Sequence, residues 1–95
     1  MTSRTKLTNE QITAALTSLP GWSLDNSTLH REIKFDDFIH AFRFMTAAAL
    51  IAEKMNHHPN WSNVYNTVTI NLSTHDADGI TQLDINLASE MNKLI

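Results

Sequence analysis

The feature that most constrains the fold is the long stretch from Phe38 to Met55, which contains neither glycine nor proline. Its apolar residues recur three or four positions apart, a spacing that predicts an α-helix. The main stripe consists of Phe38, Phe42, Met45, Ala49 and Ala52. The residues that widen it are Ile39, Phe44, Ala48, Ile51 and Met55. A helix that is apolar around most of its circumference is covered on more than one side. In a chain of 95 residues, we expect another subunit to supply the second cover.

Two further helices are predicted near the ends of the chain. Thr8-Asn9-Glu10-Gln11 has the form of a capping box, and Pro20-Gly21 is a stop signal, so we expect a helix over about 9–19. Leu83, Leu87, Met91 and Leu94 mark one face of a closing helix, at about 80–94. Asp36 or Asp37 can cap the long central helix.

Alternating apolar and polar residues predict strands between these helices. Residues 22–25 and 28–35 flank a turn and are typical of a β-hairpin. Val64, Val68, Ile70 and Leu72 alternate with polar residues, as one long strand or as two strands broken near Asn66. The predicted order is α-β-β-α-β-β-α in a single domain over 1–95. Antiparallel hairpins with helices on one face give an α+β two-layer sandwich.

Composition excludes several classes of function. Seven Lys and Arg residues against ten Asp and Glu residues give a net charge of -3, which disfavours binding to nucleic acid. The absence of cysteine excludes disulfides and thiolate metal sites. The most apolar run, Ala47 to Ala52, is too short to cross a membrane, and no secretory signal is visible. We therefore expect no membrane association and a location in the cytoplasm.

Three of the five histidines fall where a helix or strand ends, which is where folds present reactive groups. His57 and His58 follow the central helix, and His75 follows the second pair of strands. An ordinary pKa near 6.5 lets histidine donate or accept a proton at neutral pH. Glu53 and Asp84 are the carboxylates near these joints and could orient a histidine.

Each of these residues, taken singly, also has a structural explanation. Histidines at the end of a helix interact favourably with its dipole, and His75 could cap the turn before the last helix. Asp84 fits the first turn of a helix, Trp61 fits a core, and we assign His30 and His40 to purely structural positions.

A metal site is the competing chemical interpretation, because three histidines and two carboxylates could bind zinc or iron. Adjacent histidines point about 100° apart on a helix, however, and neither H-x-x-x-H nor H-x-H occurs in the chain. We therefore expect no metal.

Taken together, the motifs are similar to those of a known family. Glu53 stands three residues before Asn56-His57-His58-Pro59, and Trp61 follows. The strand then ends in Leu72-Ser73-Thr74-His75, with Gly79 and Asp84 downstream. This pattern closely resembles the pterin-4a-carbinolamine dehydratase family, and the resemblance covers nearly the whole chain.

The resemblance implies a fold, a reaction and partners. The fold is a four-stranded antiparallel sheet with three helices on one face. The reaction removes water from 4a-hydroxytetrahydrobiopterin, or a related 4a-hydroxypterin, to give the quinonoid dihydropterin, which supports pterin recycling for an aromatic amino acid hydroxylase. The family uses no cofactor and no metal, and its members are homodimers or homotetramers.

The resemblance also implies site residues. His57, His58 and His75 would be catalytic, with His57 and His75 as the proton-transfer pair and His58 mainly holding the pterin. Glu53, Asp84 and Trp61 would support them. The substrate-binding residues would be Asn56, His57, His58, Ser73, Thr74, His75 and Asp76. Asn56 stands where an acid is frequent in the family, which favours a backbone contact there.

Two alternatives remain open at this stage. Animal relatives of the family also act as dimerisation cofactors for a homeodomain transcription factor, so the chain could be a binding module. The intact set of histidines argues against a purely binding role, because dimerisation does not require it. The dehydratase could also act on a different pterin. The subunit number and the assignment of acid and base stay undetermined by sequence.

Overall fold

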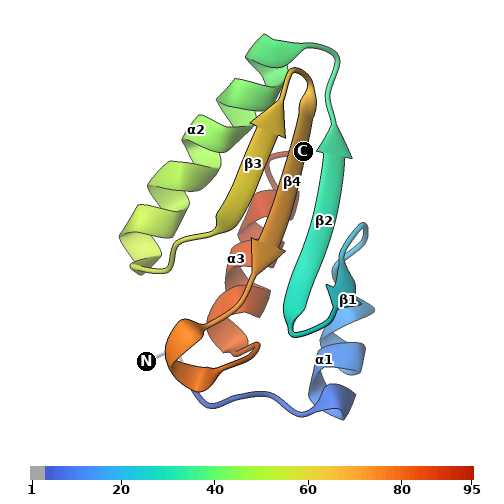
Figure 1. Ribbon diagram of the computed structural model, residues 1–95, viewed down its shortest axis with the longest axis vertical. Coiled ribbons are helices and arrows are strands. Elements are labelled where there is room, and N and C mark those ends of the chain that lie inside the picture. The colour runs from blue at the N-terminus through green and yellow to red at the C-terminus, as the bar shows by residue number, and fades with distance from the viewer. Residues whose placement is uncertain (1–3) are drawn as a thin grey trace.

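The computed structural model describes residues 4–95, and its helices and strands follow the order α-β-β-α-β-β-α (Figure 1). The elements are α1 (Asn9–Leu16), β1 (Ser23–Asp25), β2 (Thr28–Lys34), α2 (Phe38–Met55), β3 (Asn60–Val64), β4 (Thr67–Leu72), the 3₁₀ turn η1 (His75–Ala77) and α3 (Gln82–Asn92). The three helices lie on one face of a four-stranded antiparallel sheet. The predicted α+β sandwich is therefore confirmed.

The sheet has the order β1-β2-β4-β3, so the strand that ends just before Ser73 is central. Along β4, Val68, Ile70 and Leu72 are buried and face the helices, while the residues between them are only partly covered. Strand β3 pairs with β4 in a register that sets Trp61 opposite Ile70. The break near Asn66 is a tight turn between these two strands, where Tyr65 has a φ of 51°.

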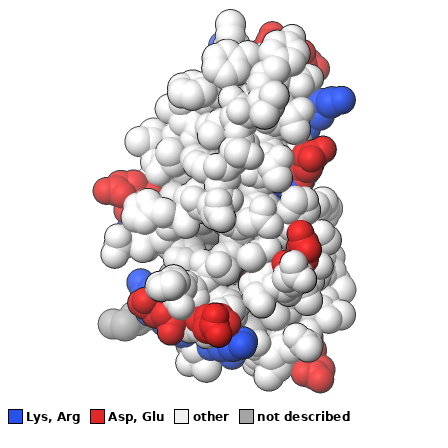
Figure 2. All heavy atoms as spheres, viewed as in Figure 1, with Lys and Arg blue, Asp and Glu red and all other residues white. Residues whose placement is uncertain are grey.

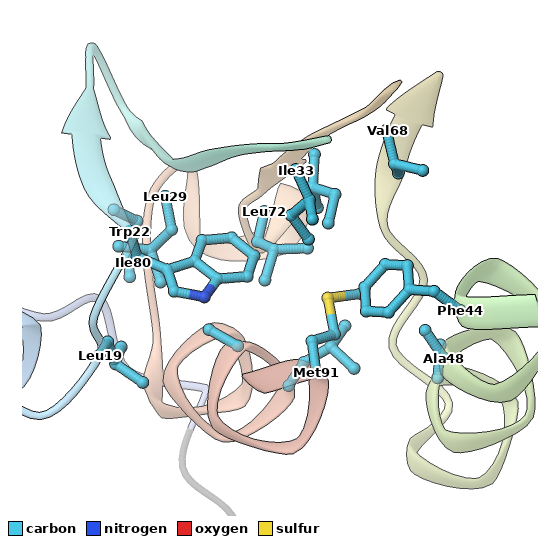
Figure 3. Close-up of a cluster of buried hydrophobic side chains, with 14 of the residues drawn as sticks. Leu19, Trp22, Leu29, Ile33, Phe44, Ala48, Val68, Leu72, Ile80 and Met91 are labelled. Carbon is cyan, nitrogen blue, oxygen red and sulfur yellow. The ribbon is translucent and has the colours of Figure 1, made fainter. Parts of the chain in front are cut away.

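The core lies between the sheet and the helices α2 and α3. In Figure 3, Phe44 and Ala48 of α2 and Met91 of α3 point toward side chains from the sheet, among them Ile33 and Leu72. Burying a side chain of this size contributes about 1.5–3 kcal/mol. This packing fixes the end of α2 and the start of α3 relative to β4, and the candidate site lies where these three segments meet.

The face of α2 that enters the core differs from the predicted stripe. Ala41, Phe44, Ala48 and Ala52 are the buried residues. Phe38, Ile39, Phe42 and Leu50 are instead 47–70% exposed, and Ala49 is also exposed. The narrow alanine face lets α2 approach the sheet closely, whereas the larger apolar side chains remain on its outer surface. The helix is thus apolar on both its buried and its exposed side, and the cover expected for the exposed side stays a prediction.

Two other details also differ from the sequence prediction. Val64 does not share the buried side of Val68 but is 75% exposed, because the turn at residues 65 and 66 places it opposite Thr67. Helix α1 ends at Leu16, and Leu19 reaches the core from the turn that follows, where its backbone N–H bonds to the carbonyl of Leu16.

The helix starts follow the predicted capping chemistry. The Thr8 hydroxyl accepts from the N–H of Gln11 at 3.2 Å, and the Gln11 side chain accepts from the N–H of Thr8 at 2.8 Å. Asp37, rather than Asp36, caps α2 by accepting from the N–H of His40 at 2.9 Å. The closing helix is shorter than predicted because Thr81 is its N-cap.

Charge is sparse on the face that shows the open side of the sheet. Figure 2 shows acidic and basic side chains around the margin of this face, with uncharged atoms across its centre. Among residues 4–95, no helix combines the length and hydropathy that a membrane crossing requires.

Candidate active site

The end of α2 separates the two adjacent histidines. Asn56 follows the helix in the left-handed conformation, with φ 52° and ψ 42°, a common way to end a helix. The N–H of His57 then bonds to the carbonyl of Ala52 at 3.0 Å. This turn directs the His57 side chain into the protein, where the residue is 7% exposed, whereas His58 remains exposed.

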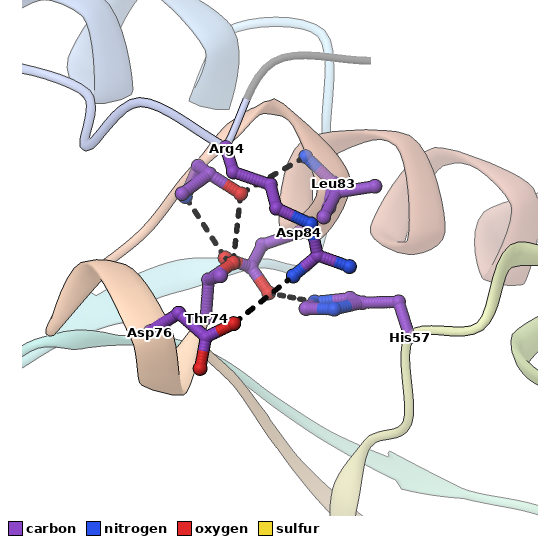
Figure 4. Close-up of polar contacts among 7 residues, drawn as sticks. Arg4, His57, Thr74, Asp76, Leu83 and Asp84 are labelled. Carbon is purple, nitrogen blue, oxygen red and sulfur yellow. Dashed lines mark hydrogen bonds and ion pairs between the residues drawn. The ribbon is translucent and has the colours of Figure 1, made fainter. Parts of the chain in front are cut away.

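Beneath His57 lies Asp84, which is fully buried. Its Oδ1 atom lies 2.6 Å from Nε2 of His57. Its Oδ2 atom accepts from the Thr74 hydroxyl at 2.8 Å and from the N–H of Thr81 at 2.9 Å. Figure 4 shows the Asp84 carboxylate between the His57 ring and Thr74. A buried carboxylate needs such partners to offset its desolvation, and here they come from three segments of the chain.

Above this network is a pocket of about 230 Å³ between the end of α2 and the β4–η1 junction. Its lining residues are Arg4, Asn56, His57, His58, Ser73, Thr74, His75 and Asp76. The structure thus brings the three histidines together around one cavity, with every residue predicted to bind substrate. Larger hollows of about 570, 440 and 360 Å³ lie along α2, and none of them contains more than one histidine.

The three residues predicted to support the site, Glu53, Trp61 and Asp84, do not line this pocket. Glu53 contacts the far side of His58, with 2.8 Å between Oε1 and Nε2, and both side chains are exposed. Trp61 packs against the hydrophobic core and does not line the pocket. Asp84 lies beneath the pocket and contacts His57 and Thr74.

The remaining histidines belong to other parts of the structure. Nδ1 of His40 lies 2.7 Å from the carboxylate of Asp37, the residue that caps α2. The hydrogen bond from the N–H of His40, followed by the bond from its side chain, lowers the pKa of the Asp37 carboxyl from its usual 3.8. His30 lies on β2, where its Nδ1 atom is buried without a partner.

Sequence reasoning missed two residues at this site. Arg4 lines the pocket and lies 3.6 Å from the Asp76 carboxylate, a contact that no local pattern predicts. Thr81 forms a capping box with Asp84, and a threonine three positions before an acid at a helix start is a signal that could have identified it. Within residues 4–95, no cluster of three or more His, Asp or Glu side chains is arranged to hold a metal ion.

Comparison with known proteins gives one consistent result. The family model described as pterin 4 alpha carbinolamine dehydratase matches residues 5–94. A protein of Solibacter usitatus named pterin-4-alpha-carbinolamine dehydratase is 58% identical over 90 residues, which cover 95% of each chain. A Mesorhizobium japonicum protein of the same name is 56% identical over 91 residues, covering 94% of this chain and 93% of the relative.

A solved structure supports the same relationship. The crystal structure of a transcriptional coactivator/pterin dehydratase from Brucella melitensis is 45% identical in sequence and superposes with a TM-score of 0.92. The match covers 94% of this chain and 97% of that one.

Proposed function

Because this chain belongs to the pterin-4a-carbinolamine dehydratase family, whose reaction removes water from a pterin carbinolamine, we propose that its three pocket histidines perform that dehydration by proton transfer. The observation that carries the proposal is the convergence of His57, His58 and His75 on one pocket above a buried carboxylate. The product is the quinonoid dihydropterin.

The reaction needs one proton delivered and one removed. The hydroxyl on the carbinolamine carbon leaves as water once it receives a proton, and a ring N–H loses its proton as the C=N bond forms. Two imidazoles in opposite protonation states can perform both steps, each contributing about 10²- to 10⁴-fold. We assign these steps to His57 and His75, and assign pterin binding mainly to His58. His57 is buried, whereas His58 and His75 are both exposed, so burial distinguishes His57 from the other two histidines.

The substrate contacts follow from the lining of the pocket. Asn56 and Ser73 to Asp76 surround the space beside the histidines, where backbone groups can pair with the donor and acceptor edge of a pterin. The contact between Glu53 and His58 would hold the ring of His58 from its solvent side. Trp61 would act only through the packing of the sheet beneath the site.

A stopped-flow dehydration assay on chemically generated 4a-hydroxytetrahydropterin tests the mechanism. We expect His57→Ala and His75→Ala each to lower kcat by about 100-fold or more. His40→Ala is the matched control, because it removes a histidine far from the pocket, and its rate should equal that of the wild type. Rates indistinguishable among all four proteins would rule out the proposed chemistry.

Since imidazoles suffice for these steps, wild-type activity should survive exhaustive chelation. A loss of activity that zinc restores would instead favour a metal mechanism.

We also propose that the protein works in the cytoplasm beside an aromatic amino acid hydroxylase, whose pterin it returns to use. In a reconstituted hydroxylase reaction with a limiting amount of pterin and a dihydropterin reductase, adding this protein should raise the number of turnovers. An unchanged yield would contradict this role and favour a different 4a-hydroxypterin as substrate.

The outer face of α2 supports a further part of the proposal, a homodimer or homotetramer. Phe38, Ile39, Phe42 and Leu50 lie around an apolar hollow of about 440 Å³, a surface that monomers rarely leave open. Light scattering should give an oligomeric mass that falls in the Phe42→Ser/Leu50→Ser double variant. Leu24→Ser, which changes an exposed apolar residue on β1, is the control. A monomeric wild-type protein would contradict this assembly.

A further inference from the structure

Two threonines beneath the pocket are placed to act on His57 through Asp84. Thr74 and Thr81 are both buried, at 2% and 0% exposure. Their hydroxyl oxygens lie 2.7 Å apart, and the Thr74 oxygen lies 2.8 Å from Oδ2 of Asp84. Thr74 is the residue before η1, Thr81 is the N-cap of α3 and Asp84 lies in the first turn of α3, so the contacts join the start of η1 to the start of α3 directly under the site.

Counting protons fixes the direction of these hydrogen bonds. An ionised carboxylate only accepts, so the single hydroxyl proton of Thr74 goes to Asp84. The contact between the two threonines must then use the proton of Thr81. The Thr81 oxygen in turn accepts from the N–H of Leu83 at 3.2 Å. The donors therefore run in one direction, from Thr81 to Thr74 to Asp84.

The same accounting determines the state of the His57 ring. The Oδ2 atom of Asp84 is engaged by Thr74 and by the N–H of Thr81, and its Oδ1 atom faces Nε2 of His57. With Asp84 ionised, a hydrogen bond across that 2.6 Å contact requires the proton to be on Nε2. In a neutral imidazole the other nitrogen, Nδ1, then carries the free lone pair.

We propose that Thr74 and Thr81 are positioning residues whose hydroxyl chain holds Asp84 so that His57 keeps its proton on Nε2 and exchanges protons with the substrate through Nδ1. The statement that His57 exchanges protons with the substrate rests on the proposed function. The statement about the tautomer of His57 rests only on the hydrogen bonds around Asp84. It also gives Thr74 a role that differs from the expected one. Its hydroxyl is committed to Asp84, and only the rest of the residue is available to line the pocket.

The tautomer can be measured without substrate, by nitrogen NMR of histidine-labelled protein with His57 assigned from the His57→Gln spectrum. The groups that face His57 are Asp84 from α3, His58 beyond α2, His75 and Asp76 from η1, and Arg4 from the N-terminal segment. Spectra are therefore recorded as the pH is raised, and the tautomer is taken from the range where the histidine signals no longer change with pH.

The variants come in matched pairs. Thr74→Val and Thr81→Val remove the hydroxyl with little change of shape, whereas Thr74→Ser and Thr81→Ser retain it. Thr8→Val is the control, because Thr8 forms the same kind of capping box at the start of α1, a helix that contributes no residue to the pocket.

We expect the wild-type His57 to be protonated on Nε2. Each valine variant should show a mixture of tautomers and a kcat about 10-fold lower, with little change in KM. The serine variants should restore both quantities, and Thr8→Val should change neither.

Several outcomes would overturn the inference. If His57 of the wild-type protein is protonated on Nδ1, the inference is wrong, and this result does not depend on whether the valine variants fold. The inference is also wrong if the valine variants fold and keep the wild-type tautomer, or if their KM rises while their kcat stays unchanged. A wild-type protein with the expected tautomer and no dehydratase activity would instead contradict the proposed function and leave the hydroxyl chain standing.

Discussion

The Nε2 atom of His57 lies 2.6 Å from Oδ1 of Asp84, although 27 positions separate the two residues in the chain. The contact joins the end of α2 to the first turn of α3 inside the protein. Because Asp84 is fully buried, this contact contributes to folding as well as to the site.

Asp84→Ala should therefore lower the free energy of unfolding by about 3 kcal/mol or more, since it leaves the donors on His57, Thr74 and Thr81 without an acceptor. Urea denaturation followed by circular dichroism measures the change. Glu53→Ala is the control, because it removes an exposed carboxylate–histidine pair and should cost less than about 1 kcal/mol. Equal losses in the two variants would contradict the prediction.

The left-handed residue that ends α2 gives a second prediction. Asn56 has a φ of 52°, a conformation that costs a residue with a Cβ about 1–2 kcal/mol and that asparagine tolerates better than most. Asn56→Val should destabilise the protein by about that amount, whereas Asn56→Gly should be neutral or stabilising. Lys54→Val, two residues earlier on the exposed side of α2, is the control for valine itself. If Asn56→Gly and Asn56→Val had the same melting temperature, backbone strain at this position would be excluded.

Two glycines should respond differently to alanine. Gly21 has a φ of 88°, and a Cβ there would lie 2.5 Å from Cζ of Arg31, whose guanidinium is held by the carbonyl of Pro20 and by Asn92. Gly21→Ala should cost about 1–2 kcal/mol or more. The three atoms nearest to a Cβ on Gly79 belong to the flexible side chain of Lys6, which can move. Thermal denaturation should show a clear loss for Gly21→Ala and a small change for Gly79→Ala. The reverse order would contradict this account.

The cap of α2 predicts a dependence of stability on pH. In the folded protein, the hydrogen bonds from His40 lower the pKa of the Asp37 carboxyl below its usual value of 3.8. The charged cap therefore stabilises the fold fully at pH values above 3.8. This contribution is lost as the pH falls through the lowered pKa. Asparagine also caps helices but does not titrate, so Asp37→Asn should be less stable than the wild type near neutrality and approach it in acid. Parallel stability curves for the two proteins, from urea titrations across this range, would contradict the prediction.

The sequence predicted those parts of the fold that depend on short-range patterns. The capping box at Thr8 and the hairpin turn after Asp25 are each set by a few neighbouring residues. Near Asn66 the sequence left one long strand and two strands as alternatives, and the structure has two. The face of α2 that enters the core could not be predicted in the same way. Because that helix is apolar nearly all round, periodicity alone does not distinguish the stripe of small residues that approaches the sheet from the larger residues outside.

The candidate site shows the same division. The three histidines were identifiable from their places at the ends of elements and from the family pattern, and the structure places them around one pocket. The position of Arg4 beside Asp76 and the burial of Thr74 depend on how distant segments pack. No local sequence pattern predicts such contacts. The spacing of Thr81 and Asp84, in contrast, is a local pattern that predicts their capping box.

Asp84 both completes the capping box with Thr81 at the start of α3 and contacts His57, and this double use has a consequence for how the protein is made. The histidines after α2 emerge from the ribosome well before α3, and a nascent chain without α3 has nothing to hold His57 in place. Catalytic competence should therefore arise in one step with the docking of the final helix. Premature termination within the last few turns would then yield an inert polypeptide rather than a weakened enzyme.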